Sequence, residues 1–279
     1  MAEIPTLELS DGTALPAIGF GTYPLTGEEG VAAITSALTT GYRLIDTAVN
    51  YGNETEVGEA IRRSGVPRAE IVVTSKLPGR HHAYDDAIAS TKESLQRLGL
   101  DHLDLHLIHW PNPSQDRYVE AWRALVDLQR QGLVRSIGVS NFTAAFLDRI
   151  IAETGVAPVV NQIELHPYFP QVEMRAANAE RGILTESWSP MGKRQAPFGE
   201  EPVRAAAQAH GVAPGQVILR WQHQLGAVPI PKSATPARQR ENLDIFDFEL
   251  TDDEVAAITA LGRPDGRLFG GDPETHEEM

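Results

Sequence analysis

Four side chains of different chemistry stand where the sequence predicts that strands end. Asp46 follows a short apolar run, Tyr51 comes soon after it, Lys76 ends a β-branched run, and His109 ends another apolar run. Such a set suits the reduction of a carbonyl group by hydride transfer, because the oxygen that gains negative charge needs a proton donor within hydrogen-bonding distance. Taken singly, Asp46 could be a helix cap and Tyr51 an ordinary loop aromatic, so the prediction depends on the whole set.

Lys76 is the residue that could prepare Tyr51 to give up a proton. An ammonium about 4 Å from the phenol would favour the phenolate by roughly 4 kcal/mol at an effective dielectric near 20. This corresponds to a lowering of the phenol pKa, from its usual value of about 10, by on the order of three units before desolvation takes some back. Asp46 would keep Lys76 charged and oriented, and His109 would polarise or orient the substrate carbonyl. We therefore expect Tyr51 to be the general acid.

Further polar and aromatic side chains end the later predicted strands. They are Ser140 and Asn141 after the fifth strand, Gln162 in the sixth, Trp188 at the end of the seventh, and Lys232 and Ser233 after the eighth. Each has an ordinary structural explanation, such as an amide that satisfies backbone groups. Their convergence on one face nevertheless favours a functional site, because packing alone would require apolar residues there.

The elements that would carry these residues alternate strand and helix along the chain. Apolar strands are predicted at residues 18–22, 43–46, 71–76, 103–109, 134–140, 159–163, 183–188 and 227–231. Helical periodicity follows each strand, as in residues 84–98, where apolar positions recur on one face. Eight units at intervals of very roughly 30 residues favour a parallel (β/α)8 TIM barrel, whose active face lies at the carboxyl ends of the strands.

Both ends of the chain carry signals of their own. Residues 6–10 and 14–18 flank Asp11-Gly12, which predicts a β-hairpin that caps one end of the barrel. Thr251 and Glu254 form a capping box that starts the last helix. From residue 263 onward the chain is rich in glycine, proline and acidic residues, so we expect a loop-like tail.

Composition limits the possible partners and compartments. The 279 residues, 42% of them hydrophobic, are enough for one domain spanning 1–279. A net charge of -14 argues against a nucleic-acid or anionic-membrane partner, although a local basic pocket remains possible. The absence of cysteine excludes disulfides, thiolate metal sites and a cysteine nucleophile. With no basic leader and no long apolar run, we expect a cytoplasmic protein.

Two other enzyme classes fit the sequence less well. A dinucleotide-binding open sheet would need a third glycine after Gly19 and Gly21, but Pro24 follows instead. A metal-dependent barrel enzyme could draw ligands from Asp46, His109, Glu164 and His166. These residues form no short ligand pair on one helix, and Lys76 would repel a cation, so we expect no metal.

The chain resembles the aldo-keto reductases from end to end, and in particular the prokaryotic branch similar to 2,5-diketo-D-gluconate reductases. The motifs that carry the resemblance are residues 41–48 with 51–54, Lys76 after 71–75, residues 105–111, 137–142 and 161–167, and residues 230–233 with Arg238, Glu241 and Asn242. The resemblance implies that Asp46, Tyr51, Lys76 and His109 are a catalytic tetrad, with Tyr51 as the acid.

The resemblance also implies a bound NADPH. Ser140, Asn141 and Gln162 would bond the carboxamide, Trp188 would stack on the nicotinamide, and Ser189, Met191 and Gly192 would follow the pyrophosphate. The adenosine end would lie near Lys232, Ser233, Ala234, Arg238, Glu241 and Asn242. Backbone N–H groups at this predicted helix start and the two cations suit a 2′-phosphate, which favours NADPH over NADH.

Substrate choice is expected to come from loops, with Tyr23 and Trp110 as candidate aromatic walls. The resemblance implies a monomer that reduces small aldehydes, dicarbonyls of the methylglyoxal or phenylglyoxal type, or keto sugars. The alternative is a cofactor-binding regulatory protein resembling potassium-channel β subunits. The complete tetrad and the lack of an added N-terminal segment favour the enzyme.

Overall fold

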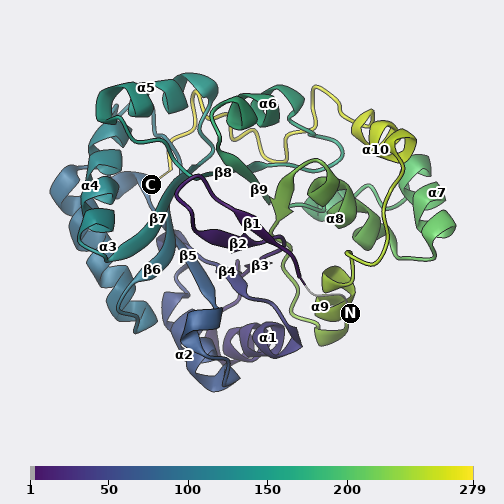
Figure 1. The fold of residues 1–279 in the computed structure, drawn as a ribbon, viewed down its shortest axis with the longest axis horizontal. Coiled ribbons are helices and arrows are strands. Elements are labelled where there is room, and N and C mark those ends of the chain that lie inside the picture. The colour runs from purple at the N-terminus through teal and green to yellow at the C-terminus, as the bar shows by residue number, and fades with distance from the viewer. Residues whose placement is uncertain (1–3, 279) are drawn as a thin grey trace.

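Eight short parallel strands form the centre of the structure, a computed structural model that describes residues 4–278 (Figure 1). Neighbouring strands pair in chain order: β3 (Phe20–Gly21), β4 (Leu44–Asp46), β5 (Val72–Leu77), β6 (Leu103–Ile108), β7 (Val134–Ser140), β8 (Val160–Glu164), β9 (Leu184–Trp188) and β10 (Ala227–Pro229). The first and last strands also meet, since the N–H groups of Gly19 and Gly21 donate to the carbonyls of Pro229 and Pro231, each at 3.0 Å. The predicted (β/α)8 barrel is therefore confirmed.

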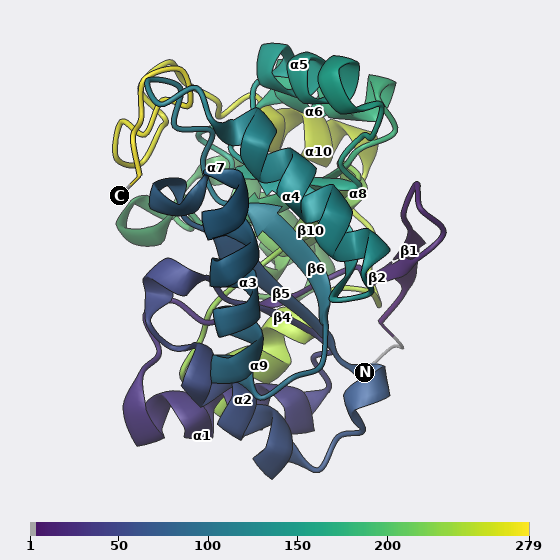
Figure 2. The ribbon, with the colours of Figure 1, turned by 90° about the vertical axis from the view of Figure 1, so that its left-hand side faces the viewer.

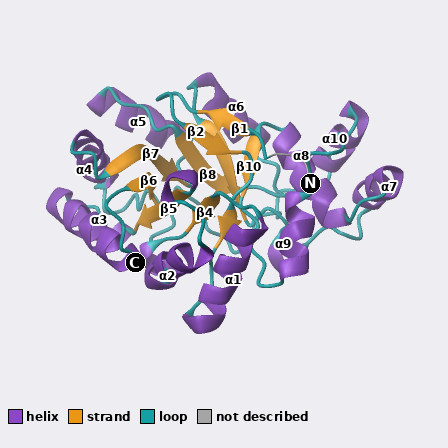
Figure 3. Cartoon of the chain, turned by 60° about the horizontal axis from the view of Figure 1, so that its bottom comes forward, coloured by secondary structure: helices purple, strands orange, loops and turns teal. Residues whose placement is uncertain are grey.

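Helices surround the strands on the outside (Figure 3). They are α1 (Gly27–Thr40), α2 (Glu54–Ser64), α3 (Tyr84–Leu98), α4 (Tyr118–Arg130), α5 (Ala144–Thr154), α6 (Val172–Glu180), α7 (Glu201–His210), α8 (Pro214–Gln224), α9 (Pro236–Leu243) and α10 (Asp252–Thr259). Short 3-10 turns are η1 (Val49–Tyr51), η2 (Arg68–Glu70), η3 (Gly79–His81) and η4 (Lys193–Gln195). In α3 the buried residues recur at helical spacing up to Leu98, and Gly99 ends the helix at φ 66°.

Successive strand residues face opposite sides of the barrel wall. In β6, Leu107 joins an apolar cluster inside the barrel, whereas Ile108 joins the core between strands and helices. In β4 the inward residue is Leu44 and the outward one is Ile45. A period of two therefore turns Asp46, the next residue, inward at the carboxyl end of the strand.

The predicted hairpin is confirmed and consists of β1 (Thr6–Glu8) and β2 (Ala14–Pro16), paired antiparallel. Its connection is longer than the two-residue Asp-Gly turn that the sequence suggested, because residues 9–13 all lie between the strands. Leu9 and Leu15 join the inner cluster with Leu44, and Asp11 accepts a hydrogen bond from Ser136 at 2.8 Å. The hairpin thus caps the amino end of the barrel, opposite the C-terminal tail (Figure 2).

The capping box predicted for the last helix is confirmed, whereas α9 starts without one. At α10, Thr251 accepts a hydrogen bond from the Glu254 N–H at 3.3 Å, as the capping box predicts. At α9, Thr235 is the N-cap residue but its side chain makes no capping bond. The N–H of Thr235 instead donates to Ser233 Oγ at 3.1 Å. None of the helices within residues 4–278 is both long and apolar enough to cross a membrane.

After α10 the chain crosses the carboxyl face of the barrel as an irregular tail. The Leu268 N–H donates to Glu164 Oε1 at 2.8 Å, which anchors the start of this segment over β8. Gly271 lies close to Trp110, because a Cβ placed on Gly271 would be 3.0 Å from Cη2 of the Trp110 ring. The tail therefore covers part of the same face to which the inward side chains of the strands point.

Candidate active site

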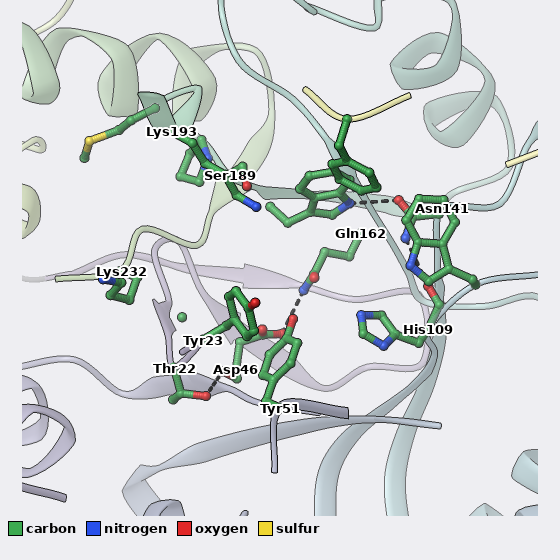
Figure 4. Close-up of a pocket in the computed structure, with 16 residues that line it drawn as sticks. Thr22, Tyr23, Asp46, Tyr51, His109, Asn141, Gln162, Ser189, Lys193 and Lys232 are labelled. Carbon is green, nitrogen blue, oxygen red and sulfur yellow. Dashed lines mark hydrogen bonds between the residues drawn. The ribbon is translucent and has the colours of Figure 1, made fainter. Parts of the chain in front are cut away.

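The four residues predicted to do the chemistry meet at the carboxyl end of the barrel. Figure 4 shows three of them, Asp46, Tyr51 and His109. Lys76 Nζ lies 2.5 Å from Asp46 Oδ1 and 3.3 Å from the hydroxyl of Tyr51. The rings of Tyr51 and His109 stand edge to face with centroids 5.8 Å apart. Asp46 and Lys76 are inward residues of β4 and β5, Tyr51 ends η1, and His109 directly follows β6.

Burial controls the charges of this cluster. Desolvation pulls down the pKa of the Lys76 ammonium, but Asp46 and then Tyr51 outweigh it and raise that pKa to about 12, so Lys76 stays charged. Desolvation also raises the pKa of Tyr51 above 10, and Lys76 opposes this without overcoming it. The lowered pKa expected for Tyr51 is therefore wrong for the protein alone, in which the phenol keeps its proton at neutral pH.

Gln162 connects this cluster to a buried carboxyl that the sequence analysis missed. Its Nε2 donates at 2.9 Å to Asp46 Oδ2 and at 2.9 Å to Glu186 Oε2. Both amide hydrogens are thus used, which leaves Gln162 Oε1 as the group free to accept from a ligand. Desolvation, reinforced by Asp46, raises the pKa of Glu186 to about 8. Glu186 could have been found by its spacing, because it lies two residues before Trp188 on one face of a predicted strand.

Trp188 is held by a chain of hydrogen bonds from β7. Its indole N–H donates to Asn141 Oδ1 at 2.8 Å (Figure 4). The Asn141 amide donates to Ser140 Oγ at 3.0 Å and to the His109 carbonyl at 3.0 Å. Ser140 in turn donates to the Gln162 carbonyl at 2.8 Å. The predicted carboxamide-binding residues and the predicted stacking residue therefore form one connected group.

A cavity of about 510 Å³ opens above these residues. It is lined by Gly21, Thr22, Tyr23, Asp46, Tyr51, His109, Trp110, Asn141, Gln162, Trp188, Ser189, Pro190, Met191, Lys193, Lys232 and Phe269. Lys193 and Phe269 were not predicted, and their rim position depends on the loop after β9 and on the tail, neither of which has a periodic sequence signal. The loop turns on left-handed residues, Ser189 at φ 51° and Gly192 at φ 71°.

The residues predicted for the adenosine end lie around the start of α9, beside the cavity rather than in it. Lys232 alone of this group lines the cavity. Ala234, Arg238 and Glu241 are exposed, whereas Ser233 and Asn242 are buried. Within residues 4–278, neither Lys232 nor Arg238 forms an ion pair with a carboxylate, so both cations are available to an anion.

The two predicted substrate walls have different surroundings. The Tyr23 side chain is 55% exposed and its ring lies 5.2 Å from that of Tyr51, so it flanks the mouth of the cavity. Trp110 is 6% exposed because its ring packs on His276 at 4.2 Å and on Phe269 at 6.2 Å. Among the described residues no cluster of three His, Asp or Glu side chains could hold a metal ion.

Comparison with known proteins adds independent findings. Residues 17–197 and 199–263 match the sequence model of the Aldo/keto reductase family. The chain is 57% identical over 279 residues to 2,5-diketo-D-gluconic acid reductase B of Corynebacterium sp., covering 100% of both, and 47% identical over 272 residues to methylglyoxal reductase DkgA of Yersinia pestis, covering 97% and 96%. A Bombyx mori aldo-keto reductase crystallised with NADP is 35% identical, with a TM-score of 0.88 over 99% of this chain and 95% of that one.

Proposed function

This chain belongs to the aldo/keto reductase family, and from that premise we propose that it reduces small carbonyl compounds with NADPH, using Tyr51 as the proton donor. The observation that carries the proposal is the buried Lys76, which reaches Asp46 at 2.5 Å and Tyr51 at 3.3 Å at the base of the cavity. A buried ammonium in contact with a phenol favours the phenolate that proton donation leaves behind.

The residues of the cavity suit the nicotinamide end of this cofactor. The Trp188 ring is held at its edge by a hydrogen bond to Asn141. The side-chain NH2 of Gln162 already donates both of its hydrogens, so its carbonyl oxygen is the group that can bind the cofactor. Asn141 and Gln162 would hold the carboxamide, and Trp188 would stack on the ring. When bound, NADPH supplies the hydride. Lys232 and Arg238 would bind the 2′-phosphate, since their charges are not paired with carboxylates in the described part of the chain.

Proton donation follows from the charges of the tetrad. Tyr51 keeps its proton until a substrate oxygen gains negative charge, because burial raises the phenol pKa. The proton of the Tyr51 hydroxyl would then transfer to that oxygen, and Lys76, kept charged by Asp46, would stabilise the phenolate that remains. His109 would hydrogen-bond the same oxygen and fix the direction of the carbonyl.

We further propose dicarbonyls and keto sugars as the substrate class. The relatives named as 2,5-diketo-D-gluconic acid reductase and methylglyoxal reductase support this, and so does the aromatic mouth formed by Tyr23, Trp110 and Phe269. The tail that packs on Trp110 narrows the mouth, which favours compact substrates. We also propose that the protein acts as a monomer, as the family resemblance implies.

The test is the loss of NADPH absorbance, and separately of NADH absorbance, with methylglyoxal, phenylglyoxal, simple aldehydes and keto sugars. We expect turnover with NADPH and a dicarbonyl, and a loss of at least about a hundredfold in Tyr51→Phe with cofactor affinity kept. Unchanged turnover in that variant would remove Tyr51 as the acid. NADPH binding without reduction of any carbonyl would instead favour the regulatory alternative.

A further inference from the structure

The C-terminal tail brings a carboxylate to His109. Oε1 of Glu278 lies 2.6 Å from His109 Nδ1, an ion-pair distance without the alignment of a full hydrogen bond. Both side chains are only 12% exposed. The attraction between a carboxylate and a protonated imidazole is strong where water is excluded, because screening by solvent is small.

The tail is fastened at this point through its main chain. Asn112 donates its side-chain amide to the Glu278 carbonyl at 2.6 Å and accepts from the Glu278 N–H at 3.3 Å. Asn112 is buried and has a left-handed backbone, with φ 47°. The neighbouring Glu277 carboxylate accepts from the Ser114 N–H at 2.7 Å. These bonds hold the tail without the Glu278 side chain, so its carboxylate is not needed as an anchor.

The Glu278 carboxylate has a set of donors that keep it ionised. Asn50 Nδ2 donates to its Oε1 at 2.8 Å, and the Gly79 N–H reaches its Oε2 at 3.4 Å. Burial raises the pKa of Glu278, but His109, Asn50 and Gly79 outweigh burial, so this pKa is lower than usual. His82, a nearby histidine, is buried and has its pKa lowered to about 4 by desolvation, so it stays neutral.

Glu278 is not among the residues that line the substrate cavity, whereas His109 is one of them. A carboxylate at Nδ1 favours a proton on that nitrogen, and the partner of one ring nitrogen decides what the other can do. With Nδ1 facing Glu278, Nε2 is the nitrogen left for a ligand.

We propose that Glu278 is a positioning residue for the reductase reaction, holding the His109 ring by its Nδ1–H so that Nε2–H can donate to the substrate carbonyl oxygen. The inference rests on the proposed function, because it assigns His109 to the substrate oxygen. It gives the tail a part in the reaction that lies outside the four predicted residues.

The test compares Glu278→Gln with Glu274→Gln, which makes the same charge change at an exposed tail position. We expect kcat to fall about tenfold in Glu278→Gln, the lower range for removing a partner that orients a functional histidine, with little change in KM. NADPH affinity, measured by fluorescence quenching, should be kept in both variants, and Glu274→Gln should match the parent protein.

A second readout does not depend on turnover. The ¹⁵N shifts of the His109 ring, assigned by their loss in His109→Asn, report which ring nitrogens carry a proton. We expect Nδ1 as well as Nε2 to carry a proton in the parent protein, and a changed distribution in Glu278→Gln. Equal kcat in parent and Glu278→Gln, equal losses in both glutamate variants, or unchanged ring shifts would each overturn the proposal. Failure of the parent protein to oxidise NADPH would reject the proposed function, while the ring shifts would still decide the role of Glu278.

Discussion

Lys76 neutralises Asp46 and, in the proposed reaction, also supports the phenolate of Tyr51. Both depend on its complete burial, with 0% of the side chain exposed. In such a place the ammonium contributes to folding only as part of a pair, since an unpaired buried charge is costly. The same residue therefore links the stability of the barrel to its chemistry.

Mutation can separate the effect of Lys76 on stability from its effect on turnover. We expect Lys76→Met to lower the free energy of unfolding by about 3–5 kcal/mol, because Asp46 loses its ammonium, and to abolish most turnover. The double variant Lys76→Met with Asp46→Asn should regain much of the stability but not the activity. Urea unfolding and NADPH oxidation measure the two effects. A double variant no more stable than the single one would contradict the pairing.

Glu186 predicts a dependence of stability on pH. Its pKa is 4.5 as the reference value and about 8 in the folded protein, so between these values the folded state holds a proton that the unfolded state has lost. The stabilisation is therefore present below about pH 4.5 and is lost at about 1.4 kcal/mol per pH unit as the pH rises toward 8.

Glu186→Gln keeps the neutral shape and removes the titration. We expect the stability of the parent protein, relative to this variant, to fall between pH 5 and pH 8 and then to level off. Unfolding by urea at pH 5, 6.5 and 8 gives the comparison. A difference between the two proteins that stays constant over this range would show that Glu186 does not titrate there.

At the scale of the element, the site residues whose positions could be predicted are those that lie on a strand. Asp46, Lys76 and Gln162 lie on strands whose apolar pattern is visible in the sequence. That pattern predicts that their side chains point inward at the carboxyl end of the barrel. Phe269 and Glu278 come from a tail without periodicity, where position depends on contacts such as those of Asn112. The pKa of Tyr51 was mispredicted because the depth of its burial is a property of the packed loops.

Helix α9 provides a matched test of cofactor choice. Arg238 and Arg240 lie two residues apart, about 200° around the helix, and so point to opposite sides. We expect Arg238→Ala to weaken NADPH binding about tenfold to hundredfold and to leave NADH binding nearly unchanged. Arg240→Ala should leave both unchanged. Fluorescence titration measures the affinity for each cofactor. Equal weakening of NADPH and NADH binding would count against a 2′-phosphate site.

Helix α2 is held close to α3 by a missing side chain. A Cβ placed on Gly58 would lie 2.1 Å from the Leu98 carbonyl oxygen. Although alanine is the better helix former, we expect Gly58→Ala to lower the free energy of unfolding by about 1–3 kcal/mol. Gly199→Ala is the control, because nothing lies within 4 Å of its ideal Cβ. Thermal unfolding compares the two, and a stabilised Gly58→Ala would contradict this packing.

At the scale of the whole molecule, the two ends of the barrel have different tasks. The hairpin closes the amino end with Leu9 and Leu15, which belong to an apolar cluster, whereas the carboxyl end keeps its polar side chains and is partly covered by the tail (Figure 2). The apolar packing of the hairpin and the proposed chemistry thus lie at opposite ends of the barrel, as the fold allows. Substitutions in the hairpin should therefore change unfolding more than turnover.

The seam between the first and last strands has a consequence for synthesis. The N–H groups of Gly19 and Gly21 find their partners only in Pro229 and Pro231, and Lys232 follows directly. The ribosome synthesises the four predicted catalytic residues well before the residues of this seam. A nascent chain therefore contains those residues long before its barrel can close and bind the cofactor. Binding of the cofactor to the emerging protein would thus report that translation has passed the eighth strand of the barrel.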